Sequence, residues 1–123
     1  MLRDPVPGDW PMIRRDYAAT SFSPLDQIDA DNVDGLTLAW IWPMQEGGTN
    51  QPAPLAHDGT IYLANPGGAV QALEGATGTL IWQYDVGAEV APRGLVLYED
   101  KLIFQSNPGW AITASDARMV ALD

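Results

Sequence analysis

Apolar and polar residues alternate over short runs of this chain, and turn-forming residues separate the runs. The clearest run covers residues 36–43, where Leu36, Leu38, Trp40 and Trp42 occupy every second position before Pro43 ends the run. A period of two places these side chains on one face of a β-strand. We therefore expect a strand with one strongly buried face over residues 36–43.

Beyond residue 51 the same period recurs in four short segments separated by strong turn signals. The expected strands cover residues 53–56, 60–64, 69–73 and 80–85. Between them lie His-Asp-Gly, Asn-Pro-Gly-Gly and Gly-Ala-Thr-Gly, which are combinations that form tight turns. Four strands at a spacing of about ten residues form one antiparallel sheet, or one blade of a β-propeller. We place this first blade at residues 52–85.

The pattern then restarts, which indicates a second unit over residues 93–123. Strands are expected at 95–98 and 101–105, and Tyr98 holds the position that His57 holds 41 residues earlier. The triplet 121–123 repeats the triplet 72–74 at a distance of 49 residues, so the second unit carries 8 additional residues around 107–110. Repeats of this length are typical of propeller blades. A blade needs neighbours on both sides, so we expect the chain to be a fragment of a larger ring.

Residues 1–35 lack this periodicity and are expected to form an N-terminal arm with short helical turns. Three prolines within the first 11 residues oppose a regular helix. Trp10, Tyr17 and Phe22 are the expected apolar anchors of the arm. Helical turns are expected at 23–28, where Ser23 precedes a proline, and at 31–33.

Charge and composition exclude several classes of function. Six basic residues face sixteen acidic ones, for a net charge of -10, which opposes binding to nucleic acid and to an anionic membrane surface. The chain has no cysteine, so disulfides and cysteine-based metal sites or nucleophiles do not occur in this segment. No apolar run approaches the roughly 20 residues of a membrane span, and the first residues lack the apolar core of a signal peptide.

The most informative motif is Ala-Leu-Glu-Gly-Ala-Thr-Gly-Thr-Leu-Ile-Trp at residues 72–82. Gly78 permits the positive φ of a tight hairpin, and the Thr77 hydroxyl can hold that turn by a local hydrogen bond. Trp82 then offers a large flat face to the next blade. The segment resembles the tryptophan-docking motif Ala-x-Asp-x-x-Thr-Gly-x-x-x-Trp of the quinoprotein propellers, with Glu74 in place of the aspartate.

The resemblance extends along most of the chain to the alcohol dehydrogenases that use pyrroloquinoline quinone (PQQ). The segments that carry it are 7–10, 23–28, 32–33, 38–40, 50–55 and 58–62, in this order and spacing. The fold that the resemblance implies is all-β, an N-terminal arm plus roughly the first two blades of an eight-bladed β-propeller. In that family the strand at 36–43 joins the last blade and closes the ring.

The same resemblance implies an activity, a cofactor and partners. The whole protein is expected to oxidise alcohols with PQQ, while a calcium or lanthanide ion polarises the quinone and an aspartate acts as general base. Electrons would pass to an acceptor such as a cytochrome c, and the family implies a periplasmic location. The metal ligands and the catalytic aspartate are expected downstream of this segment, which alone would be inactive.

Two residues of this chain match cofactor positions of the family. Gln51 aligns with a PQQ-contacting glutamate of the methanol dehydrogenases, and Arg93 aligns with an arginine that contacts the quinone. A guanidinium suits anionic oxygens because it presents several donors in a rigid fork. The family often carries adjacent cysteines a few residues before this arginine, where the present sequence reads Val-Gly-Ala-Glu at 86–89.

Several alternatives stay open at this point. The main one is a non-enzymatic propeller with the same repeats, such as the outer-membrane assembly scaffold lipoproteins, which bind proteins with their blades. A small self-standing β domain is another. At the level of single residues, Arg93 and Gln51 are alternatively solvated loop residues. His57 is expected to be a solvated turn residue, and the acidic residues at 29–34 are expected to cap helical turns.

Overall fold

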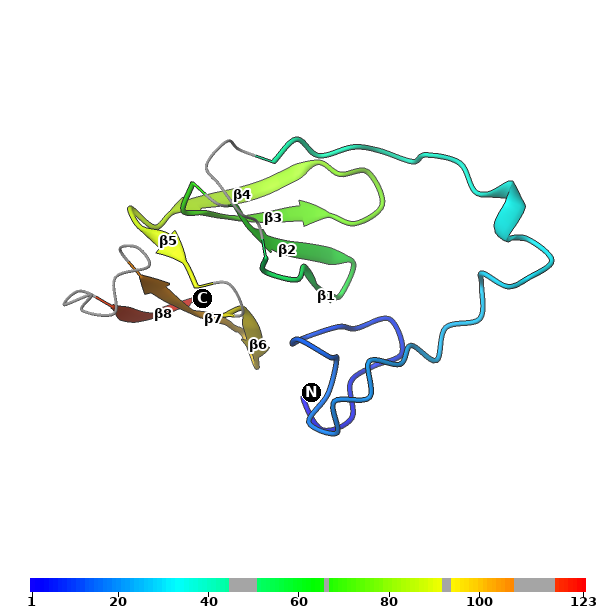
Figure 1. Ribbon diagram of the computed structural model, residues 1–123, viewed down its shortest axis with the longest axis horizontal. Helices are drawn as coiled ribbons and strands as arrows, with labels where there is room; N and C mark the ends of the chain where they lie inside the picture. The colour runs from blue at the N-terminus through cyan, green and yellow to red at the C-terminus, as the bar shows by residue number, and fades with distance from the viewer. Residues whose placement is uncertain (45–50, 66, 92–93, 108–116) are drawn as a thin grey trace.

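The computed structural model describes residues 1–44, 51–65, 67–91, 94–107 and 117–123, and they form two antiparallel sheets and a long N-terminal arm (Figure 1). Their elements are the 3₁₀ turn η1 (Val33–Gly35) and the strands β1 (Leu55–His57), β2 (Thr60–Ala64), β3 (Ala69–Glu74), β4 (Leu80–Asp85), β5 (Glu89–Val90), β6 (Val96–Tyr98), β7 (Lys101–Asn107) and β8 (Arg118–Leu122). The described part of the chain contains no α-helix. The all-β fold predicted from the alternating pattern is therefore confirmed.

The first sheet has the strand order β1-β2-β3-β4, as expected for one propeller blade. Three of its four strands start where the pattern predicted, whereas β1 begins at Leu55, two residues later than the expected 53–56. The turn from β1 to β2 requires left-handed backbone, with φ of 46° at Asp58 and 74° at Gly59. Aspartate and glycine are among the residues that tolerate this conformation.

The second sheet is built around β7, which pairs with β8 on one edge and with both β5 and β6 on the other. Glu89 pairs with Asn107 at one end of β7, and Tyr98 pairs with Lys101 at the opposite end. The first strand of this blade is therefore split into β5 and β6. The predicted start of the second blade at residue 93 leaves out β5, which the structure places in the same sheet.

The core lies between the two sheets and draws on both. Leu55 and Val70 of the first sheet pack in one cluster with Leu97 and Phe104 of the second, and all four are almost fully buried. Trp82 is partly buried against this cluster, which is where the motif predicted its indole face. Burial of one such side chain stabilises a fold by about 1.5–3 kcal/mol, so this contact between sheets holds the two blades together.

The beginning of the arm folds back on itself as a compact lobe. The Arg15 guanidinium donates to the carbonyl oxygens of Pro5, at 3.2 Å, and Val6, at 3.4 Å. The Tyr17 amide donates to the Leu2 carbonyl at 3.2 Å. Tyr17 as a whole is nevertheless 65% exposed, and so is Phe22. The prediction that Tyr17 and Phe22 anchor the arm is therefore wrong for the described part of the chain. Hydrogen bonds from Arg15 and from backbone groups hold the lobe together instead.

Trp10, the third predicted anchor, does pin the arm. Its amide donates to the Ala56 carbonyl at 2.7 Å, and its carbonyl accepts from the Ala56 amide at 3.0 Å. Two residues later, Met12 forms a bridge with Val96 of β6. The arm therefore lies along the exposed edges of both first strands.

The helical turn predicted at 23–28 is not formed, whereas the one predicted at 31–33 is present as a turn that continues into η1 and ends at Gly35. Ser23 accepts only the Leu25 amide, at 3.3 Å, in a local turn, and no helix follows. The one helical element of the described arm is η1, which starts at Val33 and buries no residue. Helices of a few residues are marginal without a buried face, which explains why capping signals alone did not produce one.

Residues 36–43 form no strand in the structure, although their alternating pattern predicted one. A strand needs a hydrogen-bonded neighbour, and the described residues provide none here. Leu36 and Leu38 are exposed, whereas Trp40 and Trp42 are half-buried against the first sheet. The Trp40 indole donates to the Gly75 carbonyl at 3.0 Å. The pairing of this segment with a last blade therefore stays a prediction.

Candidate functional site

Of the two residues predicted to bind the cofactor, Gln51 precedes the first strand of the first blade, and Arg93 lies in the sequence between β5 and β6, the two parts of the first strand of the second blade. Gln51 comes four residues before β1 and its side chain is exposed. Arg93 comes three residues before β6 and lies outside the described residues. The structure therefore describes the position of Gln51 but not that of Arg93. The role of both residues in cofactor binding stays a prediction.

The arm shows that the two first strands run in the same direction. Its bridge from Trp10 to Ala56 is antiparallel, and so is its bridge from Met12 to Val96. Because one extended segment is antiparallel to both β1 and β6, these strands are parallel to each other. Their starting ends, which follow Gln51 and Arg93 in the sequence, thus belong to the same end of the two-blade unit. We call it the start end.

A buried network of side-chain amides lies in the first sheet at this end. Gln71 is 3% exposed and accepts hydrogen bonds from the Asn65 amide and from the Trp42 indole, the latter at 3.0 Å. Its own amide donates to Gln83 at 2.7 Å, and Gln83 donates to Asp85 at 2.8 Å. The network fixes the turn after β2 and fastens the arm to the sheet. The sequence analysis missed it, because alternation alone predicts an apolar residue where Gln71 lies.

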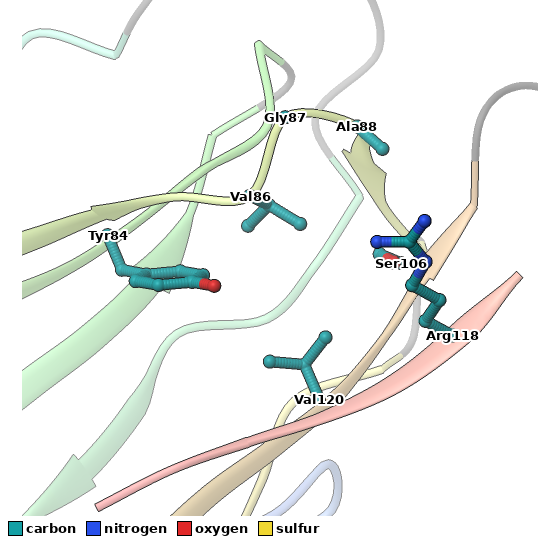
Figure 2. Close-up of a pocket in the computed structure, with 7 residues that line it drawn as sticks. All are labelled: Tyr84, Val86, Gly87, Ala88, Ser106, Arg118 and Val120. Carbon is teal, nitrogen blue, oxygen red and sulfur yellow. The ribbon is translucent and has the colours of Figure 1, made fainter. Parts of the chain in front are cut away.

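The link between the two blades packs closely on the turn after β2. The Val86 amide donates to the Gly68 carbonyl at 2.8 Å. A Cβ atom at Gly68 would lie only 2.4 Å from the Ala88 carbonyl oxygen, so no larger residue fits there. This link occupies the place where the resembled family often carries adjacent cysteines. Here Val86 and Ala88 instead line a hollow between the blades (Figure 2).

His57 is not the fully solvated turn residue that the sequence analysis expected. Its Nδ1 atom lies 2.7 Å from the Asp9 carboxylate, and the Asp9 side chain is only 10% exposed. The Asp58 amide donates to the other Asp9 oxygen at 3.3 Å. This hydrogen-bonded pair holds the arm on the turn between β1 and β2.

Two further acidic residues of the arm accept local hydrogen bonds. Asp29 accepts the amides of Asp31, at 2.9 Å, and Asn32, at 3.0 Å, in a turn just before η1. The Thr20 hydroxyl, at 2.7 Å, and the Thr20 amide lower the pKa of Asp16 below its ordinary value. The described residues contain no group of three or more acidic, histidine or cysteine side chains that could hold a metal ion.

The described residues also contain no helix long and apolar enough to cross a membrane.

Comparison with known proteins gives consistent matches over nearly the whole chain. The profile of the glucose/ethanol/alcohol dehydrogenase β-propeller domain that binds PQQ matches residues 10–123. The dehydrogenase subunit of the alcohol dehydrogenase (quinone) from Gluconobacter oxydans (strain 621H) is 34% identical over 95% of this chain. The quinohemoprotein alcohol dehydrogenase from Comamonas testosteroni is 34% identical over 94% of it. The chain spans 16% of the length of each of these relatives.

Two solved structures have the same arrangement of strands. The crystal structure of the Comamonas testosteroni enzyme matches with a TM-score of 0.78 and 33% identity, covering 94% of this chain and 18% of that one. A europium-containing methanol dehydrogenase matches with a TM-score of 0.74 and 27% identity, covering 96% of this chain and 21% of that one. From its repeat pattern, its motif at 72–82 and these matches, the chain belongs to the PQQ-dependent alcohol dehydrogenase family and forms part of its β-propeller.

Proposed function

We propose that the whole protein to which this chain belongs oxidises alcohols with PQQ as its cofactor. The match of the PQQ propeller profile over residues 10–123 carries the proposal. The names of the relatives support it, since those compared here are described as quinone, quinohemoprotein or cytochrome c alcohol dehydrogenases.

In this proposal, Gln51 and Arg93 are the residues of this chain that would bind the cofactor. Gln51 is exposed, so its amide is available to donate a hydrogen bond to a carboxylate or quinone oxygen. Arg93 would supply a positive charge and paired donors, which suit the same anionic oxygens. When bound, PQQ supplies the two-electron acceptor for alcohol oxidation. The contribution proposed for this chain is therefore to bind and orient, not to transfer a proton.

The other parts of the proposal concern the rest of the protein. A calcium or lanthanide ion would act as Lewis acid beside an aspartate base, with ligands from outside the described residues. The relative from Thauera butanivorans, 29% identical, is named 1-butanol dehydrogenase (cytochrome c), which supports a cytochrome c as electron acceptor. Such a partner would place the protein in the periplasm.

The test is reconstitution of the intact protein. We would remove bound metal with a chelator, add PQQ with Ca²⁺ or La³⁺, and measure ethanol- and 1-butanol-dependent reduction of an artificial electron acceptor. Quinone binding is measured separately by quenching of tryptophan fluorescence, since this chain alone carries five tryptophans. We expect Arg93→Gln to weaken quinone binding, whereas Arg3→Gln, an exposed arginine of the arm, leaves it unchanged.

The outcomes separate the enzyme from its main alternative. Failure of the wild-type protein to bind PQQ with either metal would contradict the proposal and favour a protein-binding scaffold. Equal binding by Arg93→Gln and Arg3→Gln would leave PQQ as the cofactor but remove Arg93 from its site.

A further inference from the structure

A hollow of about 220 Å³ lies between the end of β4 with the link that follows it and the strands β7 and β8 of the second sheet. Figure 2 shows Tyr84 and Val86 on one side of it and Val120 with Arg118 on the other. At about 30 Å³ per water molecule, this volume corresponds to roughly seven waters. The hollow therefore has room for a small organic molecule.

The strand register explains why an arginine borders this hollow. Val90 pairs with Ser106, and Ser106 pairs with Arg118, so the three residues form one row across β5, β7 and β8. Paired residues project from the same face of a sheet. The next row on that face contains Phe104 and Val120, and Phe104 is fully buried in the core between the blades. Ser106 and Arg118 thus end an apolar layer that faces the first blade.

The two polar side chains of this row have no partner among the described residues. Ser106 is 4% exposed and borders the hollow, and its hydroxyl forms no hydrogen bond within the described part of the chain. Arg118 forms no ion pair with the carboxylates that the structure describes. Arg118 is exposed at this end of β8, and a guanidinium favours a carboxylate held in its fork.

Among the described residues, the acidic side chains of the neighbouring strands β4 and β5 do not block an anion here. Asp85 follows Tyr84 in β4 and is therefore on the opposite face of that strand, where Gln83 donates to it at 2.8 Å. Glu89 precedes Val90 in β5 and likewise projects from the face opposite the core. In a chain with a net charge of -10, Arg118 is thus a local positive group beside an apolar surface.

We propose that this hollow binds a small monocarboxylate with a short apolar tail. The carboxylate would pair with Arg118 and accept the Ser106 hydroxyl, while the tail would lie between Val86 and Val120. This assignment requires neither quinone nor metal, so it is independent of the proposed dehydrogenase activity.

The experiment is calorimetric titration of the intact protein with sodium butanoate, at constant ionic strength. We expect formate to bind at least tenfold more weakly, since each buried methylene contributes about a fourfold gain in affinity. We expect Arg118→Gln to weaken butanoate binding at least tenfold. Arg3→Gln removes the same charge from an exposed position in the arm and should bind butanoate like the wild type.

A second measurement on the wild-type protein guards against a folding defect in the variant. Phenylglyoxal modifies arginine, and the extent of reaction at each site can be followed by mass spectrometry. Butanoate should slow modification of Arg118 and leave that of Arg3 unchanged. The proposal is overturned if butanoate protects neither residue, if Arg118→Gln binds it normally, or if inorganic phosphate binds as tightly, which would indicate an unspecific anion site.

Discussion

Replacement of Gly78 by alanine tests whether the arm closes on the first blade through Trp40. A Cβ atom at Gly78 would lie 2.6 Å from Cδ2 and 2.7 Å from Cε3 of the Trp40 indole, closer than real contacts of this kind. The indole would have to move, which would break its hydrogen bond to the Gly75 carbonyl at 3.0 Å. The φ of +71° at Gly78 adds a backbone cost for any residue with a side chain.

These costs have separate sources and can be added approximately. The left-handed backbone costs about 1–2 kcal/mol for alanine. The lost hydrogen bond costs about 0.5–1.5 kcal/mol. The displaced indole, turned away from its preferred rotamer, costs about 0.5–1.5 kcal/mol more. Gly78→Ala should therefore lower the free energy of unfolding by roughly 2–5 kcal/mol.

The assay is urea unfolding of the intact protein, with Gly59→Ala as matched control. Gly59 has a nearly equal φ of +74°, but nothing lies within 4 Å of its would-be Cβ atom. It should therefore show the backbone cost alone. In a Trp40→Ala background, Gly78→Ala should fall to the cost seen at Gly59, because the clash is gone. Equal costs of Gly78→Ala with and without the indole would refute the contact.

Three further predictions concern the arm and the buried amide network. Asp9→Asn removes the carboxylate that contacts His57, so limited trypsin digestion should cleave the arm faster than in the wild type. An unchanged rate would show that this contact does not hold the arm. Gln71→Leu leaves the indole and amide groups that donate to Gln71 without an acceptor, and should lower the free energy of unfolding by about 1–3 kcal/mol in urea titrations. A loss no larger than that of Gln105→Leu, a variant of an exposed glutamine outside the network, would argue against the network. The Thr20 hydrogen bonds lower the pKa of Asp16 in the folded state. The stability that they give the folded arm is therefore fully present at a pH above the Asp16 pKa of the unfolded chain, and it is lost as the pH falls through the Asp16 pKa of the folded chain. Thr20→Val should therefore make stability of the arm less dependent on pH in the acid range, as followed by proteolysis with an acid-active protease, and an unaltered pH profile would contradict this linkage.

The strands of the first blade could be predicted because their local signals agree. The strands predicted at 60–64 and 80–85 have the same bounds as β2 and β4, and glycine-containing turns separate the strands. The arm could not be predicted in the same way. Tyr17 and Phe22 are apolar but exposed, because the arm is held by tertiary contacts that no local pattern specifies, such as the carbonyl groups bound by Arg15.

The segment 36–43 shows why a correct local pattern can give no strand. Two of its four alternating apolar residues do contact the first sheet, since the indoles of Trp40 and Trp42 donate hydrogen bonds to Gly75 and Gln71. The other two, Leu36 and Leu38, belong to the same alternating set, but no described residue packs on them and they are exposed. A strand is a property of two segments, so the pattern predicts an extended conformation and the partner decides whether it becomes a strand.

The candidate site likewise depends on tertiary contacts. The N-terminal arm pairs with both β1 and β6, and no local sequence pattern predicts this placement of the arm. Gln51 and Arg93 are 42 positions apart, and resemblance alone assigned them to one cofactor. The structural argument is separate: the arm is antiparallel to both β1 and β6, so the two strands that follow these residues start at the same end. Any substitution that releases Trp10 or Met12 from these bridges should therefore loosen the first strands of both blades together, and with them the end of the propeller where the cofactor is proposed to bind.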